Sequence, residues 1–403
     1  MILKLAWKNS WRNRRRTLIT ISAIAFAVMS AVLMRSVNQG MEEKMLESIV
    51  KNNMGYIQIH AQGFWEDQML DNGFESSEVD IDAVLALPNV DKVDKKLEAG
   101  TLSSFENFTR GTYIMSYDQS AGIPNKITNN ITEGRFPEVG ADEILMGEEL
   151  ADYLNLNIGD TVVFFGQGYH GAMAAGLYSL SGKIDMQIPE LNRVIAYMCM
   201  EDLQYFLSAP EIVTALVVDL KNPDQLEETR LEIQAILGAD YEVMTWKEIN
   251  PELEQLMLTS ESKGLIMNFI LYMIITFVMF GTILMATQER KFELGVLTAI
   301  GVKKRKSMAM VVLENVFVSI IGVIVGVIFA SPIAYYFHFN PIELSGEQAE
   351  LMEKMGFEAI IPFSVDPQIA INHAMVVLVI SIVLILYPIL VIRRLKPVEA
   401  MKL

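Results

Sequence analysis

The residues of this sequence that could do chemistry begin with a glycine-rich stretch, Gly166-Gln-Gly-Tyr-His-Gly171. It has the spacing with which dinucleotide-binding proteins hold a pyrophosphate, but such a site also needs a following helix and an acidic residue about 20 positions further on. We expect a flexible glycine-rich hairpin instead, which returns over residues 177–184. Its apolar tip, with Tyr169, Met173 and Leu177, is predicted to be either a contact site for a partner or packed core.

The other reactive side chains do not form a recognisable catalytic or metal-binding set. The four histidines, at positions 60, 170, 338 and 373, are far apart, so each is expected to be solvated or hydrogen-bonded rather than a metal ligand. Cys199 is the only cysteine, which excludes an internal disulfide and a cysteine-based metal cluster. The sequence lacks the ATP-binding pattern Gly-x-x-x-x-Gly-Lys-Ser/Thr. We therefore expect no catalytic residue, no bound cofactor, no metal and no ATP hydrolysis by this chain itself.

One acidic residue, Glu314, lies in an otherwise apolar run, where a carboxylate is costly unless it is paired or hydrated. It is about two helical turns from Lys306, so snorkelling or a basic partner near the end of the run would satisfy it. A role in coupling is the alternative hypothesis. Further along the same run, Gly322, Gly326 and Ala330 recur every four residues, which lets a neighbouring helix approach closely. That helix would belong either to the same subunit or to a second copy.

A charged stretch, residues 289–304, lies between two segments that are apolar enough to span a membrane. Apolar residues recur at helical spacing between its charged ones. This pattern predicts a short helix along the membrane face, with one apolar side available to something outside the bilayer. We expect the charges to set orientation and partner choice, and Leu294, Val296 and Leu297 to supply the contact.

The composition indicates membrane helices combined with a soluble domain. Of the 403 residues, 52% are hydrophobic, which is too many for an ordinary soluble enzyme. The expected fold class is an α-helical membrane protein with four transmembrane helices and a large mixed α+β extracytoplasmic domain inserted between helices 1 and 2. The predicted order is a cytosolic amphipathic N-terminal helix (1–16), helix 1 (17–37), the extracytoplasmic domain (38–263), helix 2 (264–288), a cytosolic coupling loop (289–307), helix 3 (308–338), an extracytoplasmic loop (339–369), helix 4 (370–392) and a cytosolic tail (393–403).

The distribution of charge predicts the orientation in the membrane. Residues 1–16 hold six basic side chains and no acidic one, and loop 289–307 holds six basic side chains. Residues 38–263 hold 39 acidic and 14 basic side chains, a net charge of −25. Positive charge stays inside, so both termini are expected in the cytosol and residues 38–263 outside. A cleaved signal peptide is the competing interpretation, because Ala23-Ile-Ala25 and Ala25-Phe-Ala27 resemble cleavage sites, but the long apolar run and the later spans favour a membrane helix.

The outer domain shows both strand and helix patterns. Strands are predicted where β-branched and aromatic residues cluster, over residues 55–60, 112–116, 161–166, 193–198 and 214–220. Helices are predicted over residues 80–87, 147–156, 201–207 and 223–237, the last with Asn222 as N-cap and Pro223 at its first position. Residues 37–50 and 247–263 are predicted to be stalk helices, continuous with the first two spans and able to transmit motion between domain and membrane.

Several motifs together resemble the FtsX-like permease family of ABC transporters. They are Leu5-Ala-Trp-Lys-Asn-Ser-Trp-Arg-Asn-Arg14 at the start, Glu289-Arg-Lys-Phe-Glu-Leu-Gly-Val-Leu-Thr-Ala-Ile-Gly301 followed by Val302, the later acid Glu314, and Arg393-Arg-Leu-Lys-Pro-Val-Glu-Ala-Met401 near the end. The outer domain is similar to the MacB-type periplasmic core, through Gly55-Tyr-Ile-Gln-Ile-His60, Glu143-Ile-Leu-Met-Gly-Glu-Glu-Leu-Ala151 and Leu156-Asn-Ile-Gly-Asp160. The resemblance covers nearly the whole chain.

The resemblance implies a membrane subunit, not an enzyme, in the bacterial inner membrane. Two permeases, identical or different, would pair, and each would rest on a separate cytosolic ATPase that binds ATP and Mg. The resemblance assigns the contact with the ATPase to a coupling helix that contains Glu289, Arg290, Phe292, Glu293, Leu294, Gly295, Val296, Leu297, Ala299 and Gly301.

In the family, closure of the ATPases moves the stalk helices, and the periplasmic domains convert that motion into work, which is mechanotransmission. The length and domain order are closest to the LolC/LolE-like permeases, which implies lipoprotein release to a periplasmic carrier and contact with membrane lipid. MacB-like efflux of peptides or drugs and a signalling role are the alternatives. A membrane-anchored enzyme is disfavoured because no catalytic set is recognisable, and no nucleic acid is expected among the partners.

Overall fold

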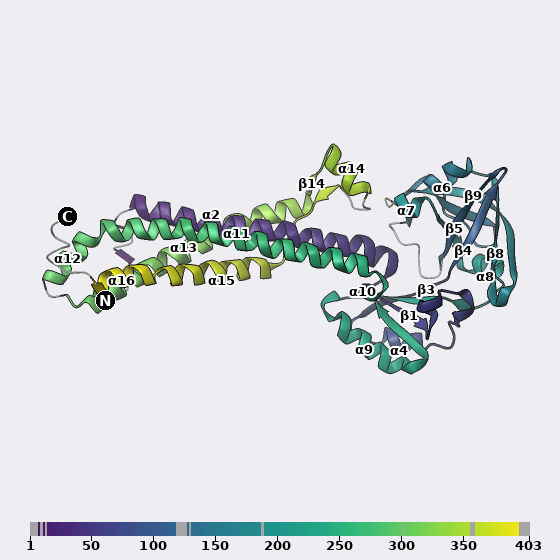
Figure 1. Ribbon diagram of the computed structural model, residues 1–403, viewed down its shortest axis with the longest axis horizontal. Helices are drawn as coiled ribbons and strands as arrows, with labels where there is room; N and C mark the ends of the chain where they lie inside the picture. The colour runs from purple at the N-terminus through teal and green to yellow at the C-terminus, as the bar shows by residue number, and fades with distance from the viewer. Residues whose placement is uncertain are drawn as a thin grey trace. The chain divides into compact units, whose positions relative to one another are not determined.

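The computed structural model of the protein describes residues 7–8, 11–12, 14–117, 127–128, 130–186, 189–300, 302–354 and 359–394 (Figure 1). The chain divides into two compact units. We call them the helical unit, which comprises Met1–Glu43, Leu256–Glu343 and Ile360–Leu403, and the α/β unit, which comprises Lys44–Gln255 and Leu344–Ala359.

Long helices make up most of the helical unit. They are α2 (Arg14–Met45), α11 (Pro251–Glu289), α13 (Lys304–Phe339) and α15 (Pro367–Leu384), which α16 (Leu386–Arg394) continues. Within the described residues, four helical segments are long and apolar enough to cross a membrane, and the predicted spans 17–37, 264–288, 308–338 and 370–392 lie inside them. The predicted number and order of candidate spans are therefore confirmed. The shorter elements are α12 (Lys291–Ala299), β14 (Ile342–Glu343), β15 (Ile360–Ile361) and, in the α/β unit, α14 (Glu347–Lys354).

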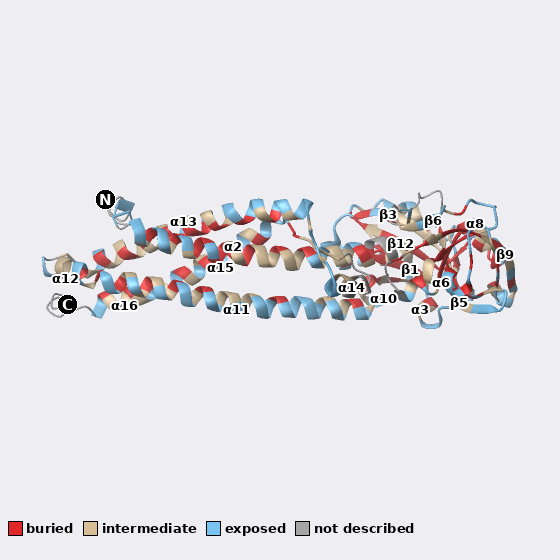
Figure 2. Ribbon diagram, turned by 90° about the horizontal axis from the view of Figure 1, so that it is seen from above, coloured by how far each residue is buried: buried red, intermediate tan, exposed pale blue. Residues whose placement is uncertain are grey.

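The long helices share an apolar core and also present apolar side chains outward. Ile24, Val28, Met279 and Val377 are buried in the core. The outward faces of α11 and α13 are exposed along much of their length (Figure 2). So large an exposed apolar surface is unfavourable in water and fits the hydrocarbon of a bilayer. The exposed residues include Leu265, Phe269, Phe277, Ile328, Phe329 and Val379.

The small residues of α13 let it approach α2 closely. A Cβ atom on Gly322 would lie 2.7 Å from side-chain atoms of Ile24, and one on Gly326 would lie 2.7 Å from the carbonyl oxygen of Ala25. Ala330, one turn further on, is fully buried. The helix that faces Gly322 and Gly326 is thus α2 of the same chain, which is the first of the two alternatives that the sequence left open.

The smaller sheet of the α/β unit has the strand order β13-β1-β12-β3, and all its pairings are antiparallel. Its strands are β1 (Ile57–Ala61), β3 (Val90–Lys96), β12 (Ala215–Leu220) and β13 (Tyr241–Thr245). The first four residues of β1 are buried, as expected of a central strand. Helices α4 (Ile81–Leu85) and α9 (Leu226–Leu237) contact each other and the outer strands of this sheet (Figure 1).

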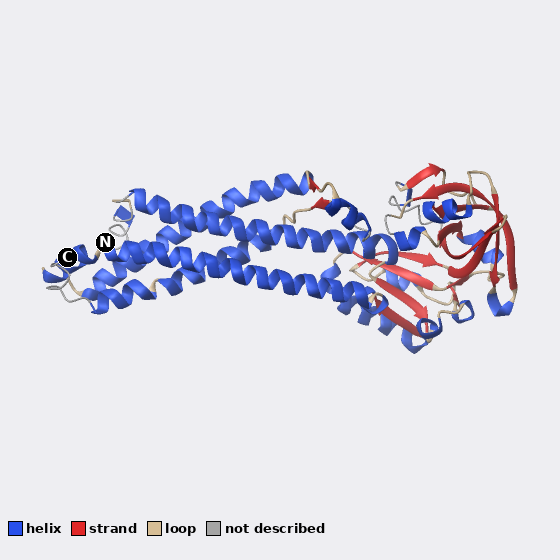
Figure 3. Cartoon of the chain, turned by 45° about the horizontal axis from the view of Figure 1, so that its top comes forward, coloured by secondary structure: helices blue, strands red, loops and turns tan. Residues whose placement is uncertain are grey.

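The larger sheet has the order β6-β9-β7-β10-β5-β4-β8, and β8 also pairs with β9, which closes the sheet on itself (Figure 3). Inward and outward residues alternate, since Val162 and Phe164 are buried whereas Val163 and Phe165 are exposed.

The strands are β4 (Glu98–Phe105), β5 (Phe108–Tyr117), β6 (Ile131–Gly134), β7 (Glu143–Gly147), β8 (Thr161–Gln167), β9 (Met173–Ile184) and β10 (Ile195–Cys199), with helices α6 (Glu148–Leu154), α7 (Pro189–Asn192) and α8 (Met200–Phe206). The unit also contains short elements: the π-helix Leu46–Met54, α3 (Phe64–Asp67), β2 (Phe74–Glu75), β11 (Ile212–Val213), α10 (Trp246–Ile249) and the 3-10 turns Leu70–Asn72, Tyr169–Gly171, Pro223–Gln225 and Gly238–Asp240.

The five predicted strands correspond to β1, β5, β8, β10 and β12, and the four predicted helices to α4, α6, α8 and α9. The side chain of Asn222 accepts a hydrogen bond from the amide of Asp224 (3.0 Å), which confirms the N-cap, although the chain first makes a 3-10 turn before α9 begins. The glycine-rich hairpin is present but shorter than predicted. Its return strand, β9, begins at Met173 rather than Leu177, because Met173–Gly176 already pair with β8.

Candidate functional site

The charged stretch between the second and third spans folds as predicted into a short helix, α12. Arg290 occupies its N-cap position, and the amide of Leu294 donates to the carbonyl oxygen of Arg290 (2.9 Å). At its end, the amide of Ile300 donates to the carbonyl oxygen of Val296 (3.1 Å). Gly301, the last of the predicted coupling residues, lies outside the described residues. We call Lys291–Ala299 with its flanking residues 289, 290 and 300 the coupling site.

One side of α12 is buried inside the helical unit. Leu294 packs with Val311 of α13 and Ile392 of α16, and Met308 lies against this cluster. Gly295 beside it is also buried. This corrects one expectation, because Leu294 was predicted to contact a partner outside the membrane. An amphipathic helix at the membrane face has to cover some apolar surface of its own chain, and Leu294 does so.

The opposite side of α12 carries exposed side chains in the part of the chain that the structure describes. Phe292 is 52% exposed and Ile300 is 72% exposed. Glu293 and Ala299 of α12 are also exposed, as is Glu289 at the end of α11, whereas Val296 and Leu297 are half-buried. This face therefore presents large apolar side chains, a composition suited to a protein partner that brings apolar residues of its own.

A buried ion pair fixes α12 to the membrane helices. Both guanidinium nitrogens Nη1 and Nη2 of Arg290 donate to the carboxylate of Glu314, the second at 2.5 Å. Arg290 is 8% exposed and Glu314 is 5% exposed. The sequence left open whether snorkelling or a basic partner satisfies Glu314, and the structure supplies Arg290 as that partner. A bidentate pair of this kind is strong and directional, so it links the start of α12 rigidly to α13.

A second ion pair joins the N-terminal segment to α12. Arg12 contacts the carboxylate of Glu293, and both side chains are about half exposed, so the pair contributes little stability. The ring of Trp7 lies edge-on to that of Phe317 in α13, with ring centres 5.9 Å apart. Trp7 and Lys8 are helical and α2 begins at Arg14; the rest of the predicted amphipathic helix 1–16 lies mostly outside the described residues.

In the α/β unit, the tip of the glycine-rich hairpin is exposed rather than packed. Met173 is 88% exposed and Leu177 is 63% exposed. Tyr169 is half-buried, and its amide donates to the carbonyl oxygen of Leu207 (2.8 Å). Of the two alternatives for this tip, the structure thus excludes packed core for Met173 and Leu177, and it leaves both side chains accessible to a partner.

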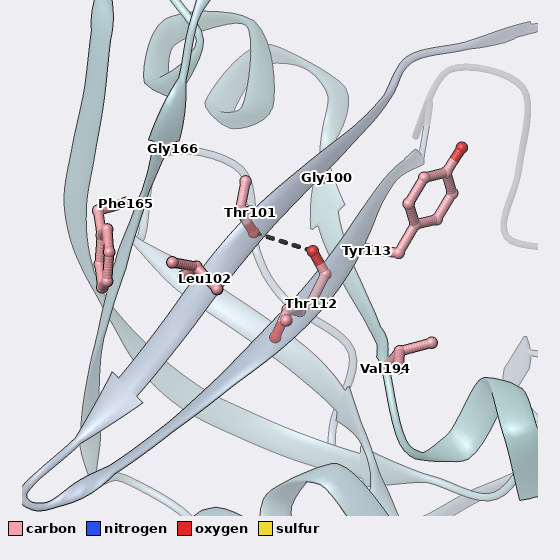
Figure 4. A pocket seen from close by; sticks show the side chains of 9 residues that line it. Gly100, Thr101, Leu102, Thr112, Tyr113, Phe165, Gly166 and Val194 are labelled. Atoms are coloured by element: carbon pink, nitrogen blue, oxygen red, sulfur yellow. Dashed lines mark hydrogen bonds between the residues drawn. The ribbon is translucent and has the colours of Figure 1, made fainter. Parts of the chain in front are cut away.

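The exposed apolar surface continues from the hairpin across β8 onto β4. Leu177 lies opposite Val163, and Phe165 lies opposite Leu102 in the next pair of strands. Beside them is a shallow depression of about 500 Å³ that the bare backbones of Gly100 and Gly111 leave open (Figure 4). No charged residue occurs between positions 161 and 182. The part of the face that β8 and β9 form is therefore apolar and uncharged on an otherwise acidic domain, which is typical of an interaction surface.

The histidines and the cysteine occupy structural positions. His60 is buried, its Nδ1 atom lies 2.8 Å from the carbonyl oxygen of Thr214, and burial lowers the pKa of its imidazole. The rings of His338 and His373 are also hydrogen-bonded, to the carbonyl oxygen of Phe363 and to the hydroxyl of Tyr272. Burial raises the pKa of the Cys199 thiol to about 11, which keeps it protonated and unreactive. The exposed His170 ring lies 4.0 Å from a carboxylate oxygen of Asp71.

Together, the spans, the domain inserted after the first of them and the short helix after the second define a multi-pass membrane protein with an inserted α/β domain. Family models identify it further. The model for the FtsX-like permease C-terminal region matches residues 265–397, and that for the MacB-like periplasmic core domain matches residues 17–236, more than half of the chain. The chain belongs to the FtsX-like permease family with a MacB-like periplasmic core domain.

Three curated relatives show how far the similarity extends. The lipoprotein-releasing system transmembrane protein LolC of Xylella fastidiosa is 22% identical over 271 residues, which are 65% of this chain and 65% of the relative. The macrolide export ATP-binding/permease protein MacB of Escherichia coli is 21% identical over 81% of this chain and 51% of its own length. The putative hemin transport system permease protein HrtB of Staphylococcus haemolyticus is 24% identical over 80% of this chain and 83% of the relative. The chain thus spans just under two thirds of LolC and about half of MacB.

Proposed function

We propose that this chain is the permease subunit of an ABC transporter and that the coupling site binds a cytosolic ATPase, expected to be a separate chain that carries ATP and Mg. The observation that supports this most directly is that α12 has one buried side and one exposed side. Leu294 and Arg290 anchor one side in the helical unit, whereas Phe292 and Ile300 are free on the other. A partner that pushes on the free side would move α13 with it, because the Arg290–Glu314 pair resists bending at the joint.

Mechanotransmission follows from this arrangement. In the proposal, two permeases pair, both termini face the cytosol and the α/β unit lies outside. Helix α2 leads the chain into the α/β unit and α11 leads it back, so a displacement of these helices is passed along the chain to that unit. The permease itself would do no chemistry; it would convert the closing of the ATPases into movement beyond the membrane.

Substitution of the free face tests the docking site. Phe292→Asp and Ile300→Asp are expected to weaken co-purification of the ATPase by about thirtyfold, the effect of losing a contact of about 2 kcal/mol. Ile158→Asp is the matched control, because Ile158 is exposed in the α/β unit. If both variants retain the ATPase as well as the control does, the coupling site is assigned to the wrong helix. Leu294→Asp is not informative, because it disrupts the packing beneath α12.

For the cargo, we propose release of a lipoprotein from the membrane to a periplasmic carrier. Similarity to LolC supports it, as does the exposed apolar tip formed by Met173 and Leu177. A carrier that shields a lipid chain needs an apolar contact at which to receive it. The uncharged surface of residues 161–182 would provide this contact without repelling an acidic or a basic carrier.

A reconstituted release assay tests the cargo. Met173→Asp with Leu177→Asp is expected to lower transfer of lipoprotein to the carrier by about tenfold for each 1.4 kcal/mol of lost contact, and ATPase binding should stay unchanged. Ile158→Asp again serves as the control. Unchanged transfer in the double variant would contradict a role for the hairpin tip.

The second candidate is export of peptides or drugs. It is favoured by the longer match to MacB, which covers 81% of this chain against 65% for LolC. If vesicles that contain the complex pump such compounds and transfer no lipoprotein, the second candidate replaces the first.

A further inference from the structure

The segment of residues 362–366, just before α15, is held between two other helices of the helical unit. We call it the clasp segment. Its backbone forms neither a helix nor a strand, yet Phe363 and Ser364 are buried. The polar groups of a buried, irregular backbone need hydrogen-bond partners in the protein. The contacts of this segment are therefore expected to be specific.

Helix α13 provides one of these partners. Nδ1 of His338 donates to the carbonyl oxygen of Phe363 (2.7 Å), an oxygen that can only accept. The ring of Phe363 stacks on that of Phe337 with centres 5.2 Å apart. The last turns of α13 thus hold one side of the clasp segment.

Helix α2 provides further hydrogen-bond partners for the clasp segment. The hydroxyl of Ser36 donates to the carbonyl oxygen of Ser364 (2.5 Å), and the amide of Ser364 donates back to the carbonyl oxygen of Ser36 (2.8 Å). The hydroxyl of Ser364 donates to Glu43 (2.8 Å), and Nε2 of Gln39 donates to Asp366 (3.3 Å). Asp366 in turn caps α15 by accepting from the amide of Gln368 (2.8 Å).

Gly40 makes this approach possible. A Cβ atom at position 40 would lie 2.7 Å from the carbonyl oxygen of Pro362 and 2.8 Å from the amide nitrogen of Ser364. Both are backbone atoms, so no side chain can rotate away to make room. Gly264 of α11 offers the contrast: it is also buried, but the nearest atom to its Cβ would be Nδ2 of Asn38 at 3.8 Å, an ordinary contact.

We propose that Gly40, Glu43 and Ser364 are positioning residues that lock the end of α2 to α13 and α15, so that these three helix ends move as one body during the transport cycle. The proposal rests on the proposed function in one respect, namely that α2 carries motion along the chain to the α/β unit. If the end of α2 were not held in place, α2 could bend near residue 40 and its motion would not be passed on. The clasp segment instead makes α13 and α15 move with α2.

Spin labels measure whether the ends of α2 and α15, which the clasp segment connects, move together. The sequence carries one cysteine, which is buried, so a Cys199→Ser background allows labels at Met41→Cys on α2 and Ile371→Cys on α15, both exposed positions. We expect one narrow distance between the labels, unchanged between the nucleotide-free complex and the complex trapped with ATP. A distance that changes between these states would overturn the proposal, because the clasp would then open during the cycle.

Two pairs of variants separate positioning from mere stability. Gly40→Ala is expected to lose the narrow distance and the transport output while ATP hydrolysis continues, whereas Gly264→Ala should behave as the unsubstituted protein. If Gly40→Ala folds poorly, Glu43→Ala against Glu43→Gln gives the same test, since the amide oxygen of Gln still accepts from Ser364. Loss of hydrolysis and transport together in every clasp variant, or a narrow distance in Gly40→Ala and Glu43→Ala, would overturn the proposal.

The proposed function and this inference fail in different ways. The distance between the labels can be measured on the permease without an ATPase, so a narrow distance that Gly40→Ala destroys supports the clasp even if no ATPase docks on α12. Conversely, an ATPase that binds through Phe292 while the distance is broad in the unsubstituted protein would support the coupling site and refute the clasp.

Discussion

Two residues that lie 24 positions apart in the sequence, Arg290 and Glu314, form a single structural feature. Each would be costly alone in an apolar surrounding, and each makes the other acceptable. Their pairing explains why an acid is present in α13 and why the basic residue at the start of α12 is buried. One buried ion pair thus connects the start of α12 to α13.

Removal of one member of this pair should be more damaging than removal of both. Glu314→Ala leaves a buried guanidinium without its partner and is expected to destabilise the protein by about 3–5 kcal/mol. Arg290→Met with Glu314→Leu should recover most of that stability while ATP-driven output remains impaired. Thermal unfolding in lipid nanodiscs measures the first effect and ATP-coupled transport the second.

Arg12→Ala is the control for these variants. It removes the exposed contact to Glu293 and should cost less than about 1 kcal/mol. If Glu314→Ala is no less stable than Arg12→Ala, the buried pair does not stabilise the protein more than the exposed pair does.

At the scale of elements, close helix packing depends on a few glycines. Gly322 and Gly326 bring α13 against α2, and Gly40 brings α2 against the clasp segment. In a bilayer, where apolar burial does not drive helices together, such close contact and the hydrogen bonds beside it supply the attraction. Helix α2 therefore has fixed neighbours both along α13 and at the clasp.

Enlarging one of these glycines should separate the helices. Gly326→Leu is expected to cost about 1–3 kcal/mol, as for overpacked cores, because its side chain would collide with Val28 and with the backbone at Ala25. Gly281→Leu on α11 is the control, since no atom lies within 4 Å of a Cβ atom there. Thermal unfolding compares the two variants, and equal unfolding temperatures would show that α13 does not need the close approach.

At the scale of the whole molecule, charge and apolar surface are segregated along the chain. Residues 38–263 carry a net charge of −25, whereas the sequence as a whole carries −17, so the remainder is basic. The long helices carry exposed apolar residues such as Phe269 and Phe277, which a bilayer would cover. Basic residues near the ends of the spans favour the cytosolic side, which gives the protein its expected orientation.

Cysteine labelling tests that orientation. In the Cys199→Ser background, Ser77→Cys and Gln288→Cys place one thiol at an exposed position in the α/β unit and one at the end of α11 next to α12. A membrane-impermeant maleimide added to spheroplasts is expected to label position 77, and to label position 288 only after lysis. The opposite pattern would reverse the proposed topology and remove the cytosolic coupling site.

The sequence by itself determined the features that depend on local pattern. The four spans, the helix after Arg290 and strands such as β8 follow from the lengths and periods of apolar runs. These patterns depend only on residues that are neighbours in the sequence. It did not reveal β3, whose Val-Asp-Lys-Val-Asp-Lys-Lys is charged because an edge strand is kept from pairing further, nor β4, whose polar Thr101 and Ser103 face inward because they are hydrogen-bonded there.

Only the tertiary structure decided which residues meet. The pairing of Glu314 with Arg290, the burial of Leu294 and the fit of Gly40 against residues 362–364 each join positions that are distant in the sequence. A hydrophobic period shows that a helix has an apolar side, but bilayer, partner and core are all apolar surroundings, so the period does not say which of them that side contacts. The packing of the helices makes that choice, and it turns α12 so that Leu294 is buried and Phe292 is free.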